Sequence, residues 1–290
     1  MRLASEPTEE IFLSINKIRI NINKFKLDLQ PYAAEIIGLS TSRPQDLGKL
    51  LPGFPDKMVK LQKLGIHRPK ESLPGPGDEC YSFGKFPPSL ESLQLNWTPL
   101  RPFTDNIDTL KKFTFIGNMT NLDTILEFMN KISSLERVEL YLMNESTGSG
   151  YEFKHRPRTP VLEKFKSSLV VHCYHEEVIR YLISRISFSN GANLEIHPDL
   201  DRSIGLEYIL SNVGDIAKLP TEVELDYVMR RIKLSGPNGS LSLYSVSPEE
   251  LSSAREGKYP LSFEKTQELS IIPNCSHGQS RSGYSDRYLT

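Results

Sequence analysis

The chain has 290 residues, of which 38% are hydrophobic, and a formal net charge of −1. This length suits one large domain. The near-neutral charge argues against a nucleic-acid ligand, and the polar first ten residues argue against a secretory signal. No run of about 18 apolar residues is present, which argues against a membrane span. Because its three cysteines lie far apart in sequence, we expect no disulfide framework. We further expect a monomer in the cytoplasm or nucleus, with no nucleic-acid or membrane partner.

Near the start of the chain, Leu27 and Leu29 alternate with polar residues in "FKLDLQP", which predicts a short strand centred near residue 28. A six-residue pattern then occurs four times, as "LQKLGI" from Leu61, "LESLQL" from Leu90, "LKKFTF" from Leu110 and "LERVEL" from Leu135. The starts are 29, 20 and 25 residues apart. This period and the pattern L-x-x-L-x-L are typical of leucine-rich repeats.

Each copy predicts a short strand whose side chains alternate between two faces. One such strand cannot bury its apolar face alone, so stacked copies form a parallel sheet joined by crossover segments. The segment after Phe115 predicts one crossover helix, because Leu122, Ile125, Leu126 and Met129 recur at helical spacing.

Weaker copies follow along the chain. Alternating apolar residues predict strands centred near 170, 195 and 224, with helices at 176–186 and 205–213 between them. The stretch "RRIKLSGPNGSLSLYS" predicts an antiparallel hairpin that closes the edge of the sheet, with its turn at Pro237–Gly239. A short helix capped by Ser247, a last strand near Leu269 and a polar, disordered tail at 273–290 complete the chain.

The predicted fold is therefore an α/β, leucine-rich-repeat-like solenoid that is right-handed and contains a parallel sheet of about eight strands. A C-terminal β-hairpin caps this sheet, and the solenoid forms a single domain over 1–272. Any one copy of the pattern could be an ordinary buried strand or helix, so the alternative is another α/β fold with a parallel sheet. The residues predicted to face the helices and to be buried are Leu64, Ile66, Leu93, Leu95, Phe113, Phe115, Val138 and Leu140.

No motif indicates catalysis or a cofactor. The stretch "VVHCYHEE" brings His172, Cys173 and His175 together in sequence, but His172 and Cys173 are neighbours on a strand and point to opposite faces. Cys173 is in register with Leu169 and Val171, which favours a small buried hydrophobic side chain over a zinc ligand or a nucleophile. We therefore assign no catalytic residue, no metal ligand and no cofactor.

The order of these elements resembles a known family. The segments "NLDTILEFMNKISSLERVEL", "VVHCY" with its helix, "GANLEI" and "IKLSGPNGSLSL" are similar to the C-terminal repeat region of fungal F-box proteins with leucine-rich-repeat-like domains. The resemblance covers roughly residues 11–272 and concerns architecture more than chemistry. It implies a substrate-recognition region that works in a cullin-RING ubiquitin ligase.

In that family an N-terminal F-box helix bundle binds the adaptor subunit of the ligase. Here the repeat-like region begins near Ile11, and no F-box sequence is recognisable. We therefore expect residues 1–290 to bind the adaptor only if an F-box is supplied upstream. A pull-down with purified adaptor tests this expectation, which stoichiometric binding would contradict.

The outward residues of the strands predict where a protein partner binds. These residues are Lys63, His67, Gln94, Asn96, Lys112, Thr114, Arg137, Glu139, Tyr141, His172, Glu195 and His197. The earlier strands are more basic, and the later ones, which end with Glu222, Glu224 and Asp226, are more acidic. Arg137 and Tyr141 are the expected anchors, since arginine and tyrosine are enriched at binding hot spots. The alternatives are that this face is merely solvated, or that the loop at 68–88 binds the partner.

Two classes of function remain open. One is a protein-interaction module, and the other is an enzyme on another parallel α/β fold with an unrecognised active site. An enzyme would gather several titratable residues in a closed pocket, whereas a repeat protein would spread them along an open sheet. The arrangement of these side chains in three dimensions therefore distinguishes the two.

Overall fold

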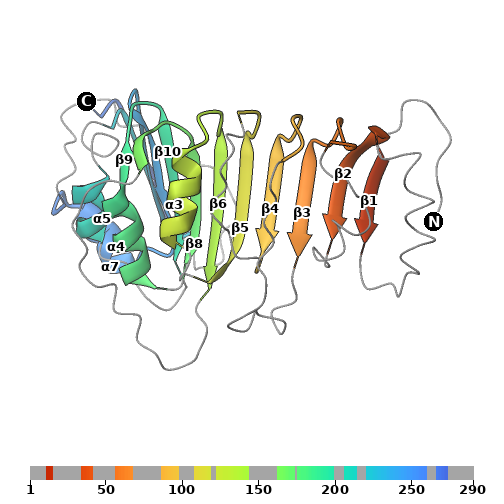
Figure 1. The fold of residues 1–290 in the computed structure, drawn as a ribbon. Coiled ribbons are helices and arrows are strands. Elements are labelled where there is room, and N and C mark those ends of the chain that lie inside the picture. The colour runs from red at the N-terminus through yellow and green to blue at the C-terminus, as the bar shows by residue number, and fades with distance from the viewer. Residues whose placement is uncertain are drawn as a thin grey trace. The chain divides into compact units, whose positions relative to one another are not determined.

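The computed structural model describes residues 11–15, 34–41, 56–67, 86–97, 108–118, 122–143, 162–173, 175–198, 206–213, 220–259 and 266–273. The chain is α/β with a mostly parallel sheet, and it divides into two compact units, 1–135 and 136–290 (Figure 1). Whether the whole chain forms a single solenoid domain stays a prediction.

Within the described residues, the first unit contains five strands, β1 (Ile11–Ile15), β2 (Ile36–Thr41), β3 (Lys63–His67), β4 (Ser92–Asn96) and β5 (Lys112–Asn118). They pair in chain order and all are parallel. Three of them were predicted from the repeated pattern, whereas β1 and β2 were not. The strand predicted at 27–29 lies outside the described residues.

The repeated pattern sets the register of these strands. Leu64 pairs with Leu93, which in turn pairs with Phe113, so that equivalent positions of successive copies stack on one another. All eight residues that were predicted to be buried are at most 2% exposed, which confirms the predicted core positions. The first leucine of each copy is buried as well, as shown by Leu61, Leu90 and Leu110, which have no exposed surface.

A hydroxyl group before the pattern links each copy to the preceding one. Ser89 Oγ lies 2.9 Å from the carbonyl oxygen of Leu61 and 2.7 Å from that of Val59, and its one proton is shared between them. Thr109 Oγ1 donates to the carbonyl of Leu90 (2.9 Å) and Ser134 Oγ to that of Leu110 (2.8 Å). Each donor immediately precedes the first leucine of its own copy. Three of the four copies therefore read Ser or Thr, Leu, two variable residues, an apolar residue, one variable residue and another apolar residue. These bonds satisfy carbonyls at the turn into each strand, where the sheet offers no partner.

Helix α3 (Leu122–Asn130) follows β5, close to the position that the sequence predicted. Its apolar residues recur at helical spacing, and it buries Ile125, Leu126 and Met129 among others. The ring of Phe128 lies 4.9 Å from that of Phe113, which fixes the helix against the apolar face of β5.

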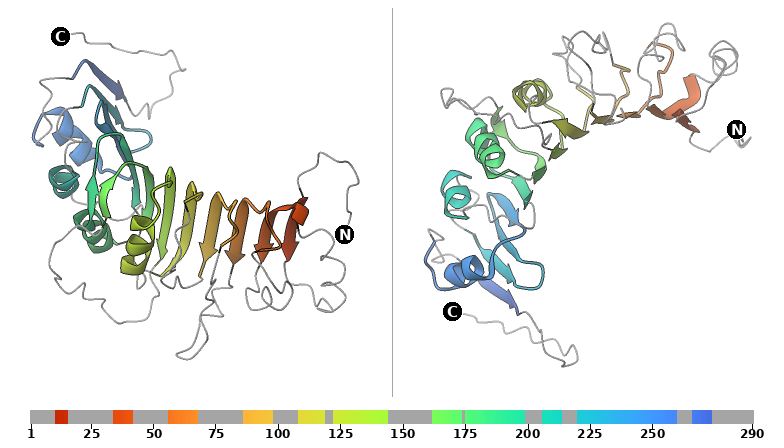
Figure 2. Two further views of the ribbon diagram at one scale, coloured as in Figure 1. Left: turned by 45° about the horizontal axis from the view of Figure 1, so that its top comes forward. Right: turned by 90° about the horizontal axis from the view of Figure 1, so that it is seen from below.

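The sheet of the second unit contains, in spatial order among the described strands, β6 (Arg137–Met143), β8 (Ser168–Cys173), β10 (Ala192–Pro198), β13 (Gly239–Leu243), β12 (Arg231–Gly236), β11 (Glu222–Asp226) and β14 (Glu268–Ile272). The pairs involving β12 are antiparallel and the others are parallel. Helices α4 (Glu176–Arg185), α5 (Leu206–Asn212) and α7 (Pro248–Arg255) lie on one side of these strands (Figure 2).

The hairpin β12–β13 forms where it was predicted, but its predicted place at the edge of the sheet is wrong. It lies inside the sheet, with β13 parallel to β10 and β12 antiparallel to β11, and β14 forms the edge instead. Gly239 starts β13 at a φ of +132°, and a Cβ there would lie 2.0 Å from the carbonyl oxygen of Ala192. This close approach of β13 to β10 is possible because position 239 carries no side chain.

Two smaller features complete the second unit. Strands β7 (Leu162–Phe165) and β9 (Ile186–Phe188), which were not predicted, form a separate parallel pair. Ser247 caps helix α7 as expected, because the Ser247 side chain accepts the Glu250 N–H while the Glu250 carboxylate accepts the Ser247 N–H.

Candidate functional site

In the first unit, the predicted binding residues lie on the face opposite the core. His67 Nδ1 and Asn96 Nδ2 are 2.5 Å apart, and Gln94 donates to Asn96 Oδ1 over 3.2 Å, so these three side chains form one polar group. Lys63 and Lys112 are exposed. Thr114 is only 8% exposed and therefore offers little surface to a partner.

In the second unit, four rings stack on the face of its own sheet opposite the core, which we call the open face. Three rings come from β6, β8 and β10, and the fourth belongs to Tyr244, which directly follows β13. Tyr141, His172, His197 and Tyr244 follow one another with ring-centroid distances of 4.2, 4.3 and 4.1 Å and interplanar angles of 4°, 10° and 14°. We call these four residues the ring row. All four side chains are partly exposed.

The register of the strands creates the ring row. Tyr141 pairs with His172 and His172 with His197, while the Tyr244 N–H donates to the carbonyl of Ile196 and so places Tyr244 next to His197. Parallel strands are about 4.8 Å apart, close to the stacking distance of aromatic rings, so equivalent positions stack face to face. The ring edges, with their hydroxyl and nitrogen atoms, are therefore presented outwards.

Charged groups accompany the ring row. Arg137 Nε lies 2.7 Å from Glu139, and His197 Nε2 lies 2.6 Å from Glu195. Arg231 pairs with Glu224, lies 3.9 Å from Asp226, and has its guanidinium carbon 5.7 Å from the centre of the Tyr244 ring. Hydrogen bonds to Tyr244 and Glu224 raise the pKa of Arg231, although burial opposes this shift.

The open face of the second unit carries an excess of negative charge. The described strands contribute six carboxylates and three permanent cations, namely Glu139, Glu195, Glu222, Glu224, Asp226 and Glu268 against Arg137, Arg231 and Lys233. The difference is three negative charges, whereas the whole chain has a net charge of only −1. The acidic character predicted for the later strands is thus a property of this face.

Two histidines, His67 in the first unit and His172 in the second, resist protonation. Burial lowers the pKa of His67, and burial together with the neighbouring His197 lowers that of His172, although Glu195 and Glu139 act in the opposite direction. A second positive charge in the stacked pair His172–His197 would be unfavourable at a ring distance of 4.3 Å.

This arrangement predicts a pH-dependent stability. Because the folded-state pKa of His172 lies below the ordinary value of 6.5, the unfolded chain binds more protons below about pH 6.5, and stability falls as the pH is lowered through this range. The variant His172→Tyr keeps a ring in the row but does not titrate there. We expect urea unfolding between pH 7.5 and 5 to show a smaller loss of stability for this variant than for the wild type, and an unchanged loss would contradict the assignment.

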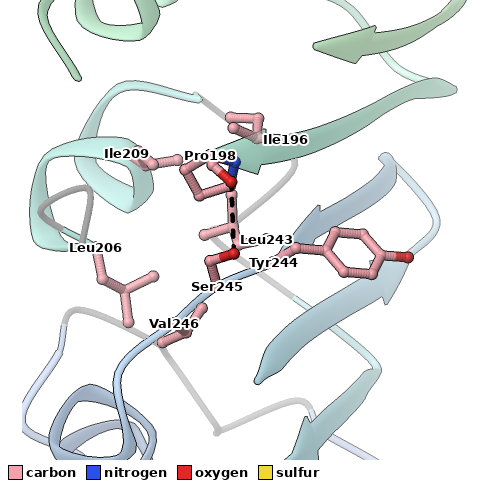
Figure 3. A pocket seen from close by; sticks show the side chains of 8 residues that line it. All are labelled: Ile196, Pro198, Leu206, Ile209, Leu243, Tyr244, Ser245 and Val246. Atoms are coloured by element: carbon pink, nitrogen blue, oxygen red, sulfur yellow. Dashed lines mark hydrogen bonds between the residues drawn. The ribbon is translucent and has the colours of Figure 1, made fainter. Parts of the chain in front are cut away.

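Among the described residues, a small cavity of about 10 Å³ lies between helix α5 and strands β10 and β13 of the second unit (Figure 3). It is bounded by Ile196, Pro198, Leu206, Ile209, Leu243, Tyr244, Ser245 and Val246, and Ser245 Oγ donates to the Pro198 carbonyl beside it over 3.4 Å. This volume holds at most one water molecule. The cavity therefore belongs to the core, and the open face remains the candidate site.

The segment around Cys173 has the alternation expected from the sequence. Cys173 is 2% exposed on the core side, and its sulfur accepts the His175 N–H over 3.4 Å, whereas His172 lies in the ring row on the other face.

Within the part of the chain that the structure describes, no three histidine, cysteine, aspartate or glutamate side chains are placed to hold a metal ion. The predicted loop at 68–88 lies almost entirely outside this part.

The structure adds three residues that the sequence did not single out. Val170, Arg231 and Tyr244 share the open face with the predicted residues. The alternation of Tyr244 with Leu243 could have placed it on this face, but its position beside His197 depends on the pairing of β13 with β10.

Comparison with protein-family models, with curated proteins and with solved structures finds no match to this chain. Among the helices that the structure describes, none has the length and apolar character needed to cross a membrane.

Proposed function

We propose that this chain is a protein-interaction module, a leucine-rich-repeat-like solenoid whose open sheet face holds a protein partner. The stacked ring row carries this proposal. Tyrosine rings, their polar edges and a neighbouring arginine are the groups that most often provide binding energy at protein interfaces. Three copies of the pattern begin with Ser or Thr before the first leucine, and the equivalent hydroxyl bonds of these residues support the repeat architecture.

The arrangement of titratable groups favours this proposal over the enzyme alternative. His172, Glu195 and Arg231 lie along an open sheet, where a protein surface can reach them. An enzyme needs reacting groups that converge on one point from which water is excluded. The ring row instead distributes its polar atoms along a line across four strands.

Binding experiments with matched variants test the proposal. The double variant Arg137→Glu, Tyr141→Ala reverses a charge beside Glu139 and removes the first ring of the row. Since truncation of a central anchor typically costs about 2 kcal/mol or more, we expect capture of specific partners from cell extract to weaken by about 30-fold. Quantitative affinity capture measures this loss, after circular dichroism has shown that the variant is folded.

The control is the double variant Arg255→Glu, Tyr259→Ala, which makes the same chemical changes at and just after α7. It should recover the same partners in the same amounts as the wild type. If the variant at Arg137 and Tyr141 also recovers them undiminished, the open face is not the binding site.

The resemblance to fungal F-box proteins suggests a setting for this interaction. We propose that the bound protein is a ubiquitination substrate, and that an F-box supplied upstream would connect it to the ligase adaptor. A fusion of an F-box helix bundle to residues 1–290 should then promote ubiquitination of a captured partner by the reconstituted ligase. Loss of this effect in the variant at Arg137 and Tyr141 would tie it to the open face, and persistence of the effect would contradict the proposal.

A further inference from the structure

Strand β14 forms one edge of the sheet among the described strands, and it pairs in parallel with β11 over all five of its residues. The Ile272 carbonyl accepts the Tyr227 N–H over 2.9 Å, so the backbone groups of Ile272 lie on the β11 side. Backbone groups of a strand point alternately to its two sides, so those of Ser270 lie on the β11 side as well. The N–H and C=O groups of Leu269 and Ile271 therefore point away from β11, along the edge of the sheet.

The usual protections of an edge strand are missing from β14. Natural proteins protect such strands with lysine, proline, a bulge or a covering element. The sequence of β14 is Glu-Leu-Ser-Ile-Ile, which contains neither lysine nor proline, and its pairing with β11 runs without a shift in register. No other described strand pairs with its outer side. The described part of the chain therefore leaves this edge available to a further strand.

The core side of the sheet is incompletely covered at β14. Leu269 and Ile271 are in register with Val223 and Leu225, which are at most 1% exposed. Leu269 and Ile271 themselves are only half-buried. A strand added beside β14 would cover both side chains and extend the apolar layer by one strand.

Exposed apolar side chains gather at the C-terminal end of β14. Four large hydrophobic side chains are exposed in the described part of the chain, and three of them are Val228, Met229 and Ile272, at 59%, 59% and 38%. The bond from the Tyr227 N–H to the Ile272 carbonyl brings the turn after β11 to this end of β14. One end of the edge is therefore apolar.

The other end of the edge is acidic. Glu268 begins β14 in register with Glu222, and both side chains are exposed. On its other side Glu222 is in register with Ser235, and the closest cation along β12, Lys233, stands beside Glu224 instead. Among the described residues, no cation forms an ion pair with Glu222 or Glu268. A strand that lies along this edge therefore meets unpaired negative charge at one end.

We infer that β14 pairs with a β-strand of a protein partner, which adds a strand to the sheet of residues 136–290. The added strand runs antiparallel to β14, since antiparallel pairs are slightly more stable per residue. It carries apolar residues opposite Leu269, Ile271 and Ile272. Opposite Glu268 it carries a lysine or an arginine. The edge of the sheet is distinct from the open face, so this partner strand is additional to the interaction proposed above.

A second copy of the chain fits this edge less well than such a partner. In an antiparallel pair of two β14 strands, the acidic end of each would lie against the apolar end of the other, so that Glu268 faces Ile272. A partner strand with an apolar residue at one end and a cation at the other satisfies both ends. Strand addition of this kind obtains its affinity from main-chain hydrogen bonds and its specificity from alternate side chains.

Two synthetic peptides test the preference for a cation. The first is Ser-Val-Val-Thr-Val-Lys-Ser, whose first valine lies opposite Ile272 and whose lysine lies opposite Glu268 in the antiparallel pair. The second has glutamate in place of lysine, and both carry the same terminal fluorophore. Fluorescence anisotropy with the full chain at low salt should show at least about threefold tighter binding of the lysine peptide, as expected for an exposed charge pair.

Matched glutamine variants locate this preference. Glu268→Gln should reduce the advantage of the lysine peptide over the glutamate peptide. The control Glu249→Gln removes an exposed carboxylate from the first turn of α7 and should leave that advantage unchanged. Equal effects of the two variants would show a general attraction of cations to the chain and contradict the assigned position.

Methylation of single peptide amides tests the hydrogen bonds without altering the protein. In the antiparallel pair the third valine of the lysine peptide lies opposite Leu269 and donates its N–H to β14, whereas the N–H of the threonine opposite Ser270 points away. Methylation of the valine nitrogen should weaken binding at least about fivefold, since it removes a main-chain hydrogen bond. Methylation of the threonine nitrogen should change the affinity by less than about twofold.

Variants at Ile271 test the same contact from the protein side. Ile271→Pro removes an N–H that points away from β11, a position at which an edge strand tolerates proline. Ile271→Ala shortens the same side chain but keeps the N–H. The proline variant should bind the lysine peptide at least about fivefold more weakly than the alanine variant, after circular dichroism has shown that both are folded. If the proline variant does not fold, the methylated peptides decide the question.

Three results would overturn the inference: no binding of the lysine peptide by the full chain, equal binding of the lysine and glutamate peptides, or equal binding of the two methylated peptides. A dimer of the chain that Ile271→Pro converts to a monomer would overturn it as well, because a second copy would then occupy the edge. The proposed function stands in each of these cases, since the open face takes no part in the contact.

Discussion

Replacement of Leu140 by alanine is expected to lower the free energy of unfolding by about 2–5 kcal/mol. Leu140 has no exposed surface and lies in register with Val171 on the adjacent strand, in the row of apolar side chains that faces the helices. The substitution removes three carbon atoms from a closely packed layer and leaves a cavity that neighbouring strands cannot readily fill. Urea unfolding followed by circular dichroism measures the change.

The matched control is Val228→Ala in the same unit. Val228 is 59% exposed at the turn between β11 and β12, where its N–H is held by the carboxylate of Asp226. Loss of an exposed aliphatic side chain should change the stability by no more than about 0.5 kcal/mol. Equal effects of the two substitutions would show that Leu140 does not belong to the core.

The second large effect is expected for Gly239→Ala, with a loss of about 2–5 kcal/mol from the combined cost of backbone strain and steric overlap. The φ of +132° is unfavourable for any residue with a side chain, and the added Cβ would lie 2.0 Å from the carbonyl oxygen of Ala192. Relief of this contact requires β13 to move away from β10. Because the pairing of these strands places Tyr244 beside His197, the ring row should be disturbed as well.

The variant Gly257→Ala separates the cost of backbone strain from the cost of steric overlap. Gly257 follows α7 at a φ of +71°, and no atom lies within 4 Å of the position of its Cβ, so this variant carries only the backbone cost of about 1 kcal/mol. Thermal unfolding should therefore rank Gly239→Ala as clearly less stable than Gly257→Ala. The reverse order would argue against the close approach of β13 and β10.

Local patterns were sufficient to predict which residues are buried. Each L-x-x-L-x-L copy contains its own alternation, and a strand that alternates must bury its apolar side, whichever strand lies next to it. Leu64, Leu93 and Phe113 are therefore in the core as predicted, and the helix at Leu122–Asn130 follows from its own periodicity in the same way. The outward positions of Tyr141, His172 and His197 are a direct consequence of this alternation.

Strand order beyond β10 was decided by tertiary structure alone. In sequence, β11 is the next strand, yet β10 pairs with β13, and the hairpin lies inside the sheet. An alternating pattern shows which face of a strand is buried, but both edges of every strand carry the same backbone donors and acceptors, so it does not identify the neighbour. Hence the sequence by itself determined the two faces and the core, whereas the fourth ring, Tyr244, and the position of Lys233 between Ser242 and Glu224 depend on which strands pair in the folded chain.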